Sequence, residues 1–250
     1  MTPTIPRIPM IREAIILAGG LGTRLRSAVP DLPKCMAPVN GRPFIAYVID
    51  YFRQAGIEKF IFALGYKSEH FDNFLDSLLP AGSYQLSVEQ EPLGTGGAIR
   101  LACSRATEQQ VLVLNGDTLF RIRPADLAAF HRERHAHCTL CLKPMQDFDR
   151  YGVVELDSGQ RVSSFREKQF YHSGLINGGV YALDAVQFLQ EDLPEKFSFE
   201  KDYLEKMYTS RRLFGLVQDD YFIDIGIPED YERAQKELQW PDSQSLNKTC

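Results

Sequence analysis

The sequence lacks the features that would assign it to a membrane, secreted or nucleic-acid-binding class. No apolar run approaches the roughly 20 residues that span a bilayer, and the first residues lack the apolar centre and small-residue cleavage site of a signal peptide. The 250 residues carry a formal net charge of −5, without the clustered Lys and Arg that duplex binding requires. We therefore expect a cytoplasmic protein that binds neither membrane nor nucleic acid.

Cysteine is too scarce and too irregularly spaced for a disulfide framework. The chain has five cysteines, and Cys35 and Cys103 fall in segments typical of a loop and a helix, so we expect reduced thiols. The stretch 135–141 contains histidines and a Cys-Xaa-Xaa-Cys, but Cys141 lies in an apolar strand-like run and no second ligand pair accompanies it. We interpret these cysteines as structural, and the charged stretch 130–137 as a solvated helix end.

Apolar runs and turn residues alternate along the chain in the manner of an α/β protein. A helix is predicted over 43–56, where apolar residues recur at helical spacing up to Gly56. Strands separated by helices predict a parallel, doubly wound sheet, and closer strands after about residue 140 predict antiparallel additions. The predicted strands are 14–18, 59–65, 111–117, 138–144, 152–157, 178–183 and 213–218.

A glycine-rich loop, within "AIILAGGLGTRLR", follows the first predicted strand, where open α/β sheets bind their ligands. Gly19, Gly20 and Gly22 allow backbone N–H groups to approach an anion closely. The loop fits neither familiar phosphate-binding pattern. A dinucleotide fingerprint would need glycine in place of Leu25, and a Walker loop would need a Gly-Lys pair, which the chain does not contain.

Two cations accompany this loop. Arg24 follows the third glycine, and Lys34 lies in "PDLPKCMAPVNGRP". A guanidinium and a lysine beside backbone donors suit a ligand with more negative charge than a dinucleotide, such as a nucleoside triphosphate. A tight glycine turn with solvated charges is the alternative interpretation.

The strings "LAGGLGTRL" and "LPKCMAPVNGRP" resemble the signature of the sugar-1-phosphate nucleotidylyltransferases. Further segments resemble that family in the same order along the chain: "EQEPLGTGGAI", "VLVLNGDTLF", "YGVVELD", "SFREKQF", "LINGGVYAL" and "FIDIGIPEDY". Cys35, Gln169 and Ile227 depart from the residues common in the family. Taken singly, each segment also fits a surface turn, as Asp117 after Asn-Gly does, so their common order is what supports the resemblance.

The resemblance implies a role for each matched residue. Arg24 and Lys34 are the implied catalytic residues, and Asp117 and Asp224 are the implied ligands of Mg²⁺. The implied nucleotide-binding residues are Leu17, Gly19, Gly20, Gly22, Thr23, Gln90, Gly94, Thr95, Asn115 and Gly116. The implied sugar-phosphate-binding residues are Gly152, Glu167, Lys168, Asn177 and Gly179.

The resemblance also implies the fold, which is the nucleotide-diphospho-sugar transferase fold. This is a single Rossmann-like α/β domain whose mixed, mainly parallel sheet is flanked by helices. We expect the domain to cover 1–240, with a nucleotide-binding half at 12–135 and a sugar-binding half at 136–240. The polar segment 241–250 is expected to be a flexible tail.

Within the family, the segment 30–66 is most similar to the heptose 1-phosphate guanylyltransferases. This implies transfer of GMP from GTP to D-glycero-α-D-manno-heptose 1-phosphate, giving a GDP-heptose for capsule, lipopolysaccharide or surface-layer glycan. Mannose 1-phosphate with GTP and N-acetylmuramate 1-phosphate with UTP are the alternative substrate pairs. An exposed apolar patch would allow a homodimer without leaving a motif.

Two other classes of protein are the alternatives to the enzyme that the resemblance implies. A non-catalytic sugar-nucleotide-binding regulatory protein would be expected to lose Arg24, Lys34 or one of the two aspartates, and all are present. A dinucleotide oxidoreductase is disfavoured because the third glycine of its fingerprint is missing.

Overall fold

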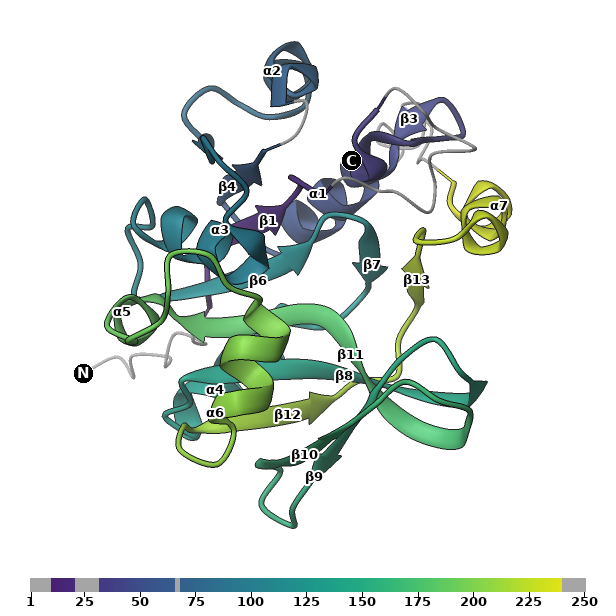
Figure 1. Ribbon diagram of the computed structural model, residues 1–250. Helices are drawn as coiled ribbons and strands as arrows, with labels where there is room; N and C mark the ends of the chain where they lie inside the picture. The colour runs from purple at the N-terminus through teal and green to yellow at the C-terminus, as the bar shows by residue number, and fades with distance from the viewer. Residues whose placement is uncertain (1–9, 21–31, 66–67, 240–250) are drawn as a thin grey trace, which may run out of the picture.

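A nine-stranded mixed sheet forms the centre of the computed structural model, which describes residues 10–20, 32–65 and 68–239 (Figure 1). The strand order is β10-β9-β11-β6-β1-β4-β5, with β8 paired to β11 and β12 paired to β8. The strands are β1 (Glu13–Leu17), β4 (Lys59–Leu64), β5 (Tyr84–Val88), β6 (Gln110–Asn115), β8 (Cys138–Phe148), β9 (Val153–Leu156), β10 (Val162–Arg166), β11 (Tyr171–Asp184) and β12 (Leu213–Val217).

The sheet has a parallel part and an antiparallel part. Strands β5, β4, β1 and β6 are parallel to one another, whereas β11 runs antiparallel to β6 and β8. The predicted Rossmann-like, mainly parallel mixed sheet is therefore confirmed. The predicted boundary between 12–135 and 136–240 falls just before β8, within this one sheet, and the division into halves stays a prediction.

Helices cover both faces of the sheet, because successive strand residues point to opposite sides. Ile16 belongs to one buried cluster, with residues of α1 (Phe44–Gln54), α4 (Pro124–Glu133) and α7 (Pro228–Glu237). Its neighbour Ile15 belongs to the other, with residues of α3 (Gly94–Cys103), α5 (Ala185–Leu189) and the π-helix η3 (Phe199–Leu204). The remaining helices are η1 (Lys34–Met36), η2 (Ser68–His70), α2 (Asp72–Leu78) and α6 (Glu205–Met207).

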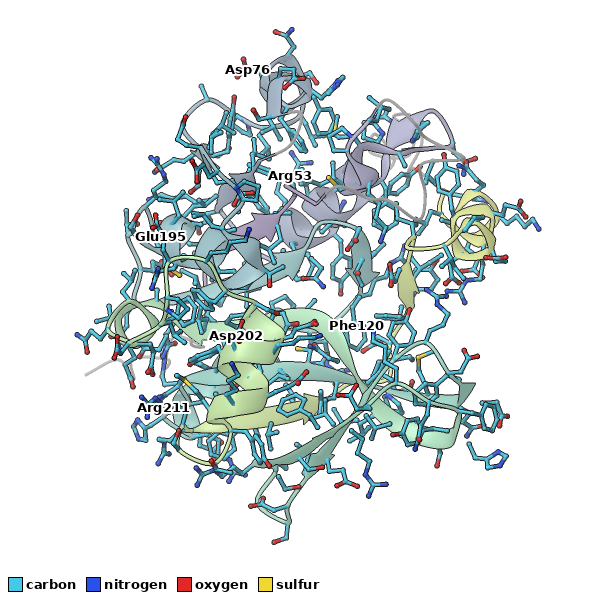
Figure 2. All side chains as sticks on the ribbon, in the orientation of Figure 1. Arg53, Asp76, Phe120, Glu195, Asp202 and Arg211 are labelled. Atoms are coloured by element: carbon cyan, nitrogen blue, oxygen red, sulfur yellow. The ribbon has the colours of Figure 1, made fainter. Side chains whose placement is uncertain are left out.

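A small ribbon beside the main sheet brings distant segments together. Strand β7 (Thr118–Phe120) pairs antiparallel with β13 (Phe222–Asp224), and Asp224 lies opposite Thr118. Phe120, labelled in Figure 2, packs so closely against β11 that a Cβ on Gly178 would lie 2.4 Å from its ring. A second ribbon pairs β2 (Pro38–Val39) with β3 (Arg42–Pro43). These short strands, like β5 and β10, were not predicted from the sequence.

The structure bears on the predictions for the cysteines of β8 and for the charged stretch 130–137. Cys138 and Cys141 lie fully buried in β8, and burial raises the pKa of both thiols, so they are packed as neutral core residues. The prediction of a solvated helix end over 130–137 is wrong for His131, which is fully buried and lies 2.9 Å from the Thr139 hydroxyl. Among the described residues, no helix is both long enough and apolar enough to cross a bilayer.

Candidate active site

A lysine and two carboxylates converge at the end of β6. The Lys34 ammonium lies 2.6 Å from Asp117 Oδ2 and 3.3 Å from Asp224 Oδ1. The Lys34 side chain is only 16 % exposed. Burial alone would lower the pKa of Lys34, but the two carboxylates outweigh burial and raise it. The ammonium therefore remains charged between two partners from distant parts of the chain.

The pairing of β7 with β13 explains how this cluster forms. Asp117 lies between the buried strand β6 and β7, and Asp224 is the last residue of β13. The backbone N–H of Ile225 donates to the carbonyl of Asp117 at 3.1 Å. The carboxylate of Asp224 also accepts a hydrogen bond from Gly226 N at 2.8 Å, which fixes one of its oxygens.

The start of the glycine loop packs tightly at the same edge of the sheet. Gly116 N donates to the Leu17 carbonyl at 2.9 Å, and a Cβ on Gly116 would lie 2.6 Å from that oxygen. A Cβ on Gly19 would lie 2.8 Å from Gly65 N, whereas Gly20 faces open space. Close backbone packing thus accounts for glycine at 19 and 116. The predicted site residues Gly22, Thr23 and Arg24 lie outside the described residues.

The segment predicted to bind the base packs against Phe197 and Phe199, at the start of η3. Gln90 is exposed in the loop before α3. Gly94 has φ +71°, and a Cβ there would lie 2.5 Å from the Phe197 carbonyl. The Thr95 hydroxyl accepts a hydrogen bond from Phe199 N at 2.9 Å, so the fold itself uses this group.

A cavity of about 420 Å³ lies next to these elements. Of the residues predicted to bind the sugar phosphate, Gly152, Glu167, Lys168 and Asn177 line it. Gly179 is outside the lining and occupies a strand irregularity with φ +70°. There it packs against another predicted site residue, since its Cβ would lie 2.7 Å from Asn115 Nδ2.

Several charged residues of this cavity were not predicted from the sequence. Glu200, Lys201 and Glu205 reach it from η3 and the start of α6. Burial raises the pKa of Glu200, and Lys168 opposes that shift. Asn177 donates to Glu200 at 3.4 Å. These residues carry no recognisable motif, and only tertiary packing brings them to the cavity.

The donor set at Asp117 and Asp224 fits a magnesium ion. Their carboxylates already converge on a single cation, the Lys34 ammonium. The described residues contain no cluster of three or more His, Cys, Asp or Glu suited to a metal. Mg²⁺ is typically held by one or two carboxylates, with phosphates and water completing its shell. Two aspartates that converge on one cation meet the carboxylate part of that requirement.

A sequence profile described as nucleotidyl transferase matches residues 13–240 of the chain. The chain belongs to the nucleotidyl transferase family. Enzymes of this family generally use a divalent metal, which agrees with the carboxylate pair.

Two curated relatives match this nucleotidyl transferase over almost their whole length. A D-glycero-alpha-D-manno-heptose 1-phosphate guanylyltransferase of Aneurinibacillus thermoaerophilus is 48% identical, covering 91% of this chain and 98% of its own. Its counterpart in Campylobacter jejuni is 45% identical, covering 88% of this chain and 96% of its own. The predicted resemblance to this family is confirmed.

A solved structure gives the same picture of the fold. HddC from Yersinia pseudotuberculosis, complexed with GMP-PN, is 34% identical, with a TM-score of 0.82 over 92% of this chain and 100% of its own. A putative glucose-1-phosphate thymidylyltransferase from Bacillus anthracis, with 21% identity and a TM-score of 0.75, shares the fold.

Proposed function

We propose that this nucleotidyl transferase transfers GMP from GTP to D-glycero-α-D-manno-heptose 1-phosphate and releases pyrophosphate. The two relatives with this name match nearly the full length of the chain, which supports the choice of substrates. The observation that carries the chemistry is the convergence of Lys34, Asp117 and Asp224 beside the 420 Å³ cavity. Tyr151 links the two, because it lines the cavity and donates to Asp224.

The reaction needs no general base. An oxygen of the sugar phosphate attacks the α-phosphorus of GTP, and the bond from that phosphorus to the pyrophosphate oxygen breaks, so the leaving group carries the electron pair away. The nucleophile is already an anion, since the second ionisation of a phosphate monoester has a pKa near 6. The barrier lies in bringing two polyanions together in line, so the protein contributes position and positive charge.

Each side chain has a defined part in this scheme. Lys34 and Arg24 neutralise charge on the α-phosphate and on the departing pyrophosphate, and Lys168 holds the sugar phosphate. Asp117 and Asp224 would hold Mg²⁺, which when bound neutralises phosphate charge.

The other predicted residues divide between the two substrates. The glycine-loop residues Leu17, Gly19, Gly20, Gly22 and Thr23, together with Gln90, Gly94, Thr95, Asn115 and Gly116, bind the nucleotide. Gly152, Glu167, Asn177 and Gly179 bind the sugar, and the lining of the cavity by three of these supports that part. We place the reaction in the cytoplasm.

The test is a panel of substrates. The purified protein is incubated with Mg²⁺, each of GTP, UTP, CTP, dTTP and ATP, and heptose, mannose or N-acetylmuramate 1-phosphate, and pyrophosphate release is followed. We expect release with GTP and heptose 1-phosphate alone. Release with another pair would keep the mechanism and replace the substrates, whereas silence across the panel with retained GTP binding would favour a regulatory protein. Light scattering on the same sample tests the predicted homodimer.

A further inference from the structure

The two carboxylate oxygens of Asp224 have different surroundings. Oδ1 faces the Lys34 ammonium at 3.3 Å and accepts from Gly226 N at 2.8 Å. Oδ2 points the other way, where the Tyr151 hydroxyl donates to it at 3.3 Å and the Arg150 guanidinium lies 3.8 Å away. Oδ2 of Asp224 is therefore occupied by Tyr151 and Arg150, whereas Oδ1 faces Lys34.

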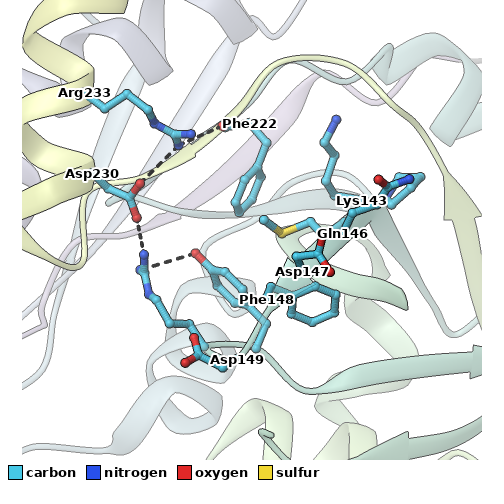
Figure 3. Close-up of a pocket in the computed structure, with 12 residues that line it drawn as sticks. Lys143, Gln146, Asp147, Phe148, Asp149, Phe222, Asp230 and Arg233 are labelled. Carbon is cyan, nitrogen blue, oxygen red and sulfur yellow. Dashed lines mark hydrogen bonds and ion pairs between the residues drawn. The ribbon is translucent and has the colours of Figure 1, made fainter. Parts of the chain in front are cut away.

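The groups that hold Oδ2 are themselves fixed by a second layer of contacts, shown in Figure 3. Arg150 forms an ion pair with Asp230 of α7, and Arg233 lies 3.3 Å from the same carboxylate. The Arg150 guanidinium stacks 5.3 Å from the centre of the Tyr151 ring. That ring lies nearly perpendicular to the ring of Phe222 of β13, with ring centres 6.1 Å apart. Tyr151 and Arg150 consequently have little freedom to move away from Asp224.

Charge explains why Asp230 belongs in this arrangement. A guanidinium 3.8 Å from Asp224 would compete with a metal ion for that carboxylate if nothing else neutralised it. Asp230 offers Arg150 a closer partner and so leaves Asp224 available to a second cation.

We propose that Tyr151 and Arg150, held by Asp230, are positioning residues that turn Oδ1 of Asp224 toward the metal and reserve Oδ2 for the protein. This rests on the proposed function, in which Asp224 is a metal ligand. The predicted motifs contain Tyr151 and Asp230 but assign them no role, and Arg150 directly precedes one of these motifs. Through the ion pair of Arg150 with Asp230, the arrangement makes α7 a support of the active site.

The test measures metal binding by the folded protein as well as activity. Mn²⁺ is used as the probe, and its electron paramagnetic resonance signal is followed as protein saturated with a non-hydrolysable GTP analogue is titrated. Loss of groups that orient a metal ligand typically weakens metal affinity 10- to 100-fold, so we expect about tenfold weaker Mn²⁺ binding in Tyr151→Phe and Asp230→Asn. The apparent KM for Mg²⁺ should rise in both variants, while kcat recovers at saturating Mg²⁺.

A matched control is available on the same side of the molecule. The Tyr221 hydroxyl donates to Glu237 at 2.8 Å, so Tyr221→Phe also removes a phenol–carboxylate hydrogen bond, and it should bind Mn²⁺ like the unaltered protein. Thermal unfolding of each variant reports its stability. Tyr151→Phe deletes a single oxygen and keeps the ring packing.

The outcomes separate this inference from the proposed function. Asp224→Asn should reduce Mn²⁺ binding to that of the GTP analogue alone, and undiminished binding would remove Asp224 from the metal site and refute that part of the proposed function. Loss in Asp224→Asn together with unaltered affinity in Tyr151→Phe and Asp230→Asn would overturn only the positioning role. Loss of kcat that Mg²⁺ does not restore would likewise contradict it.

Discussion

Strand β1 connects two clusters of carboxylates that are held in opposite ways. At its first residue, the buried Glu13 accepts backbone hydrogen bonds from Thr107 N at 2.7 Å and Glu108 N at 2.9 Å. Beyond its last residue, Asp117 and Asp224 share the Lys34 ammonium, and Asp224 also accepts from Gly226 N and the Tyr151 hydroxyl. The first end relies on backbone donors alone for its closest N–H contacts, whereas the second places a flexible cation between two carboxylates.

This difference distinguishes a carboxylate that stabilises the fold from carboxylates that are able to bind a ligand. Backbone N–H groups are placed by the fold, so a carboxylate that matches them is fully satisfied and offers nothing to a ligand. A lysine reaches its partners through a flexible stem, and its ammonium can be exchanged for another cation or shared with a phosphate. Carboxylates thus stabilise the protein at one edge of the sheet and, in the proposed function, serve chemistry at the other.

The largest effect is expected at the flexible end. Lys34→Ala should reduce turnover about 1000-fold, as removal of a charge-stabilising donor does in other active sites. The free energy of unfolding should fall by about 3 kcal/mol, because removing one partner of a mostly buried ion pair leaves its carboxylates unpaired, but the variant should remain folded. Steady-state kinetics and urea unfolding of the same preparation measure both. A variant that is unfolded under the assay conditions, or one that is folded and fully active, would erase the contrast between the two ends.

The stability of the protein should respond to pH through His131, a buried histidine of α4 that belongs to neither end of β1. Burial, aided by His137 and Arg132, lowers the pKa of His131 to about 4 from 6.5, although Asp184 opposes this shift. The folded state therefore keeps His131 neutral, and its contribution is complete above pH 6.5 and is lost as pH falls toward 4. At about 1.4 kcal/mol per pKa unit, the loss amounts to about 3 kcal/mol.

Urea unfolding between pH 7 and 4 measures this loss. His131→Gln should flatten the profile over that range relative to the unaltered protein. His172→Gln is the control, because the His172 side chain is 89% exposed and its replacement should leave the profile as it was. A profile of His131→Gln that still falls by about 3 kcal/mol would assign the pH dependence to other groups.

The smallest effect is expected at Glu13. Burial acts to raise its pKa, but hydrogen bonds from Thr107 and Glu108, with help from Lys59, outweigh burial and lower it. Its stabilising contribution is present above pH 4.5 and declines as acid protonates the folded state. Glu13→Gln should destabilise the protein by about 1 to 2 kcal/mol near neutral pH and leave turnover unchanged. A change in kcat with intact stability would mean that this cluster also serves catalysis.

The sequence allowed prediction wherever a signal was local. Apolar runs identified β1, β4 and β6, and the ordered motifs singled out Lys34, Asp117 and Asp224, which the fold brings into contact. The meeting itself was not predictable from pattern, because it depends on β7 and β13. Each has only three residues, too few to show strand periodicity.

The other residues that were not predicted from the sequence are those whose partners lie far away in the chain. Glu200 faces the cavity only because η3 packs against α3, and Arg150 meets Asp230 only because α7 follows β13. Neither has a neighbour in sequence that reveals its partner. The prediction that His131 lies in a solvated helix end was wrong for a similar reason. Charged residues surround it in the sequence, whereas in the fold it is buried beside the Thr139 hydroxyl.

The contact of Gly94 with Phe197 has a consequence for engineering the enzyme. Gly96 N donates to the Phe197 carbonyl at 3.0 Å, and the segment carrying Phe197 continues directly into the helix that bears Glu200. The loop proposed to bind the nucleotide and the helix that lines the proposed sugar cavity therefore form a single structural unit. A chimaera that exchanged only the loop at Gly94 or only the segment at Phe197 would bring a new side chain or backbone into a contact that has room only for glycine. A change of both substrate preferences therefore requires that the two segments be exchanged together.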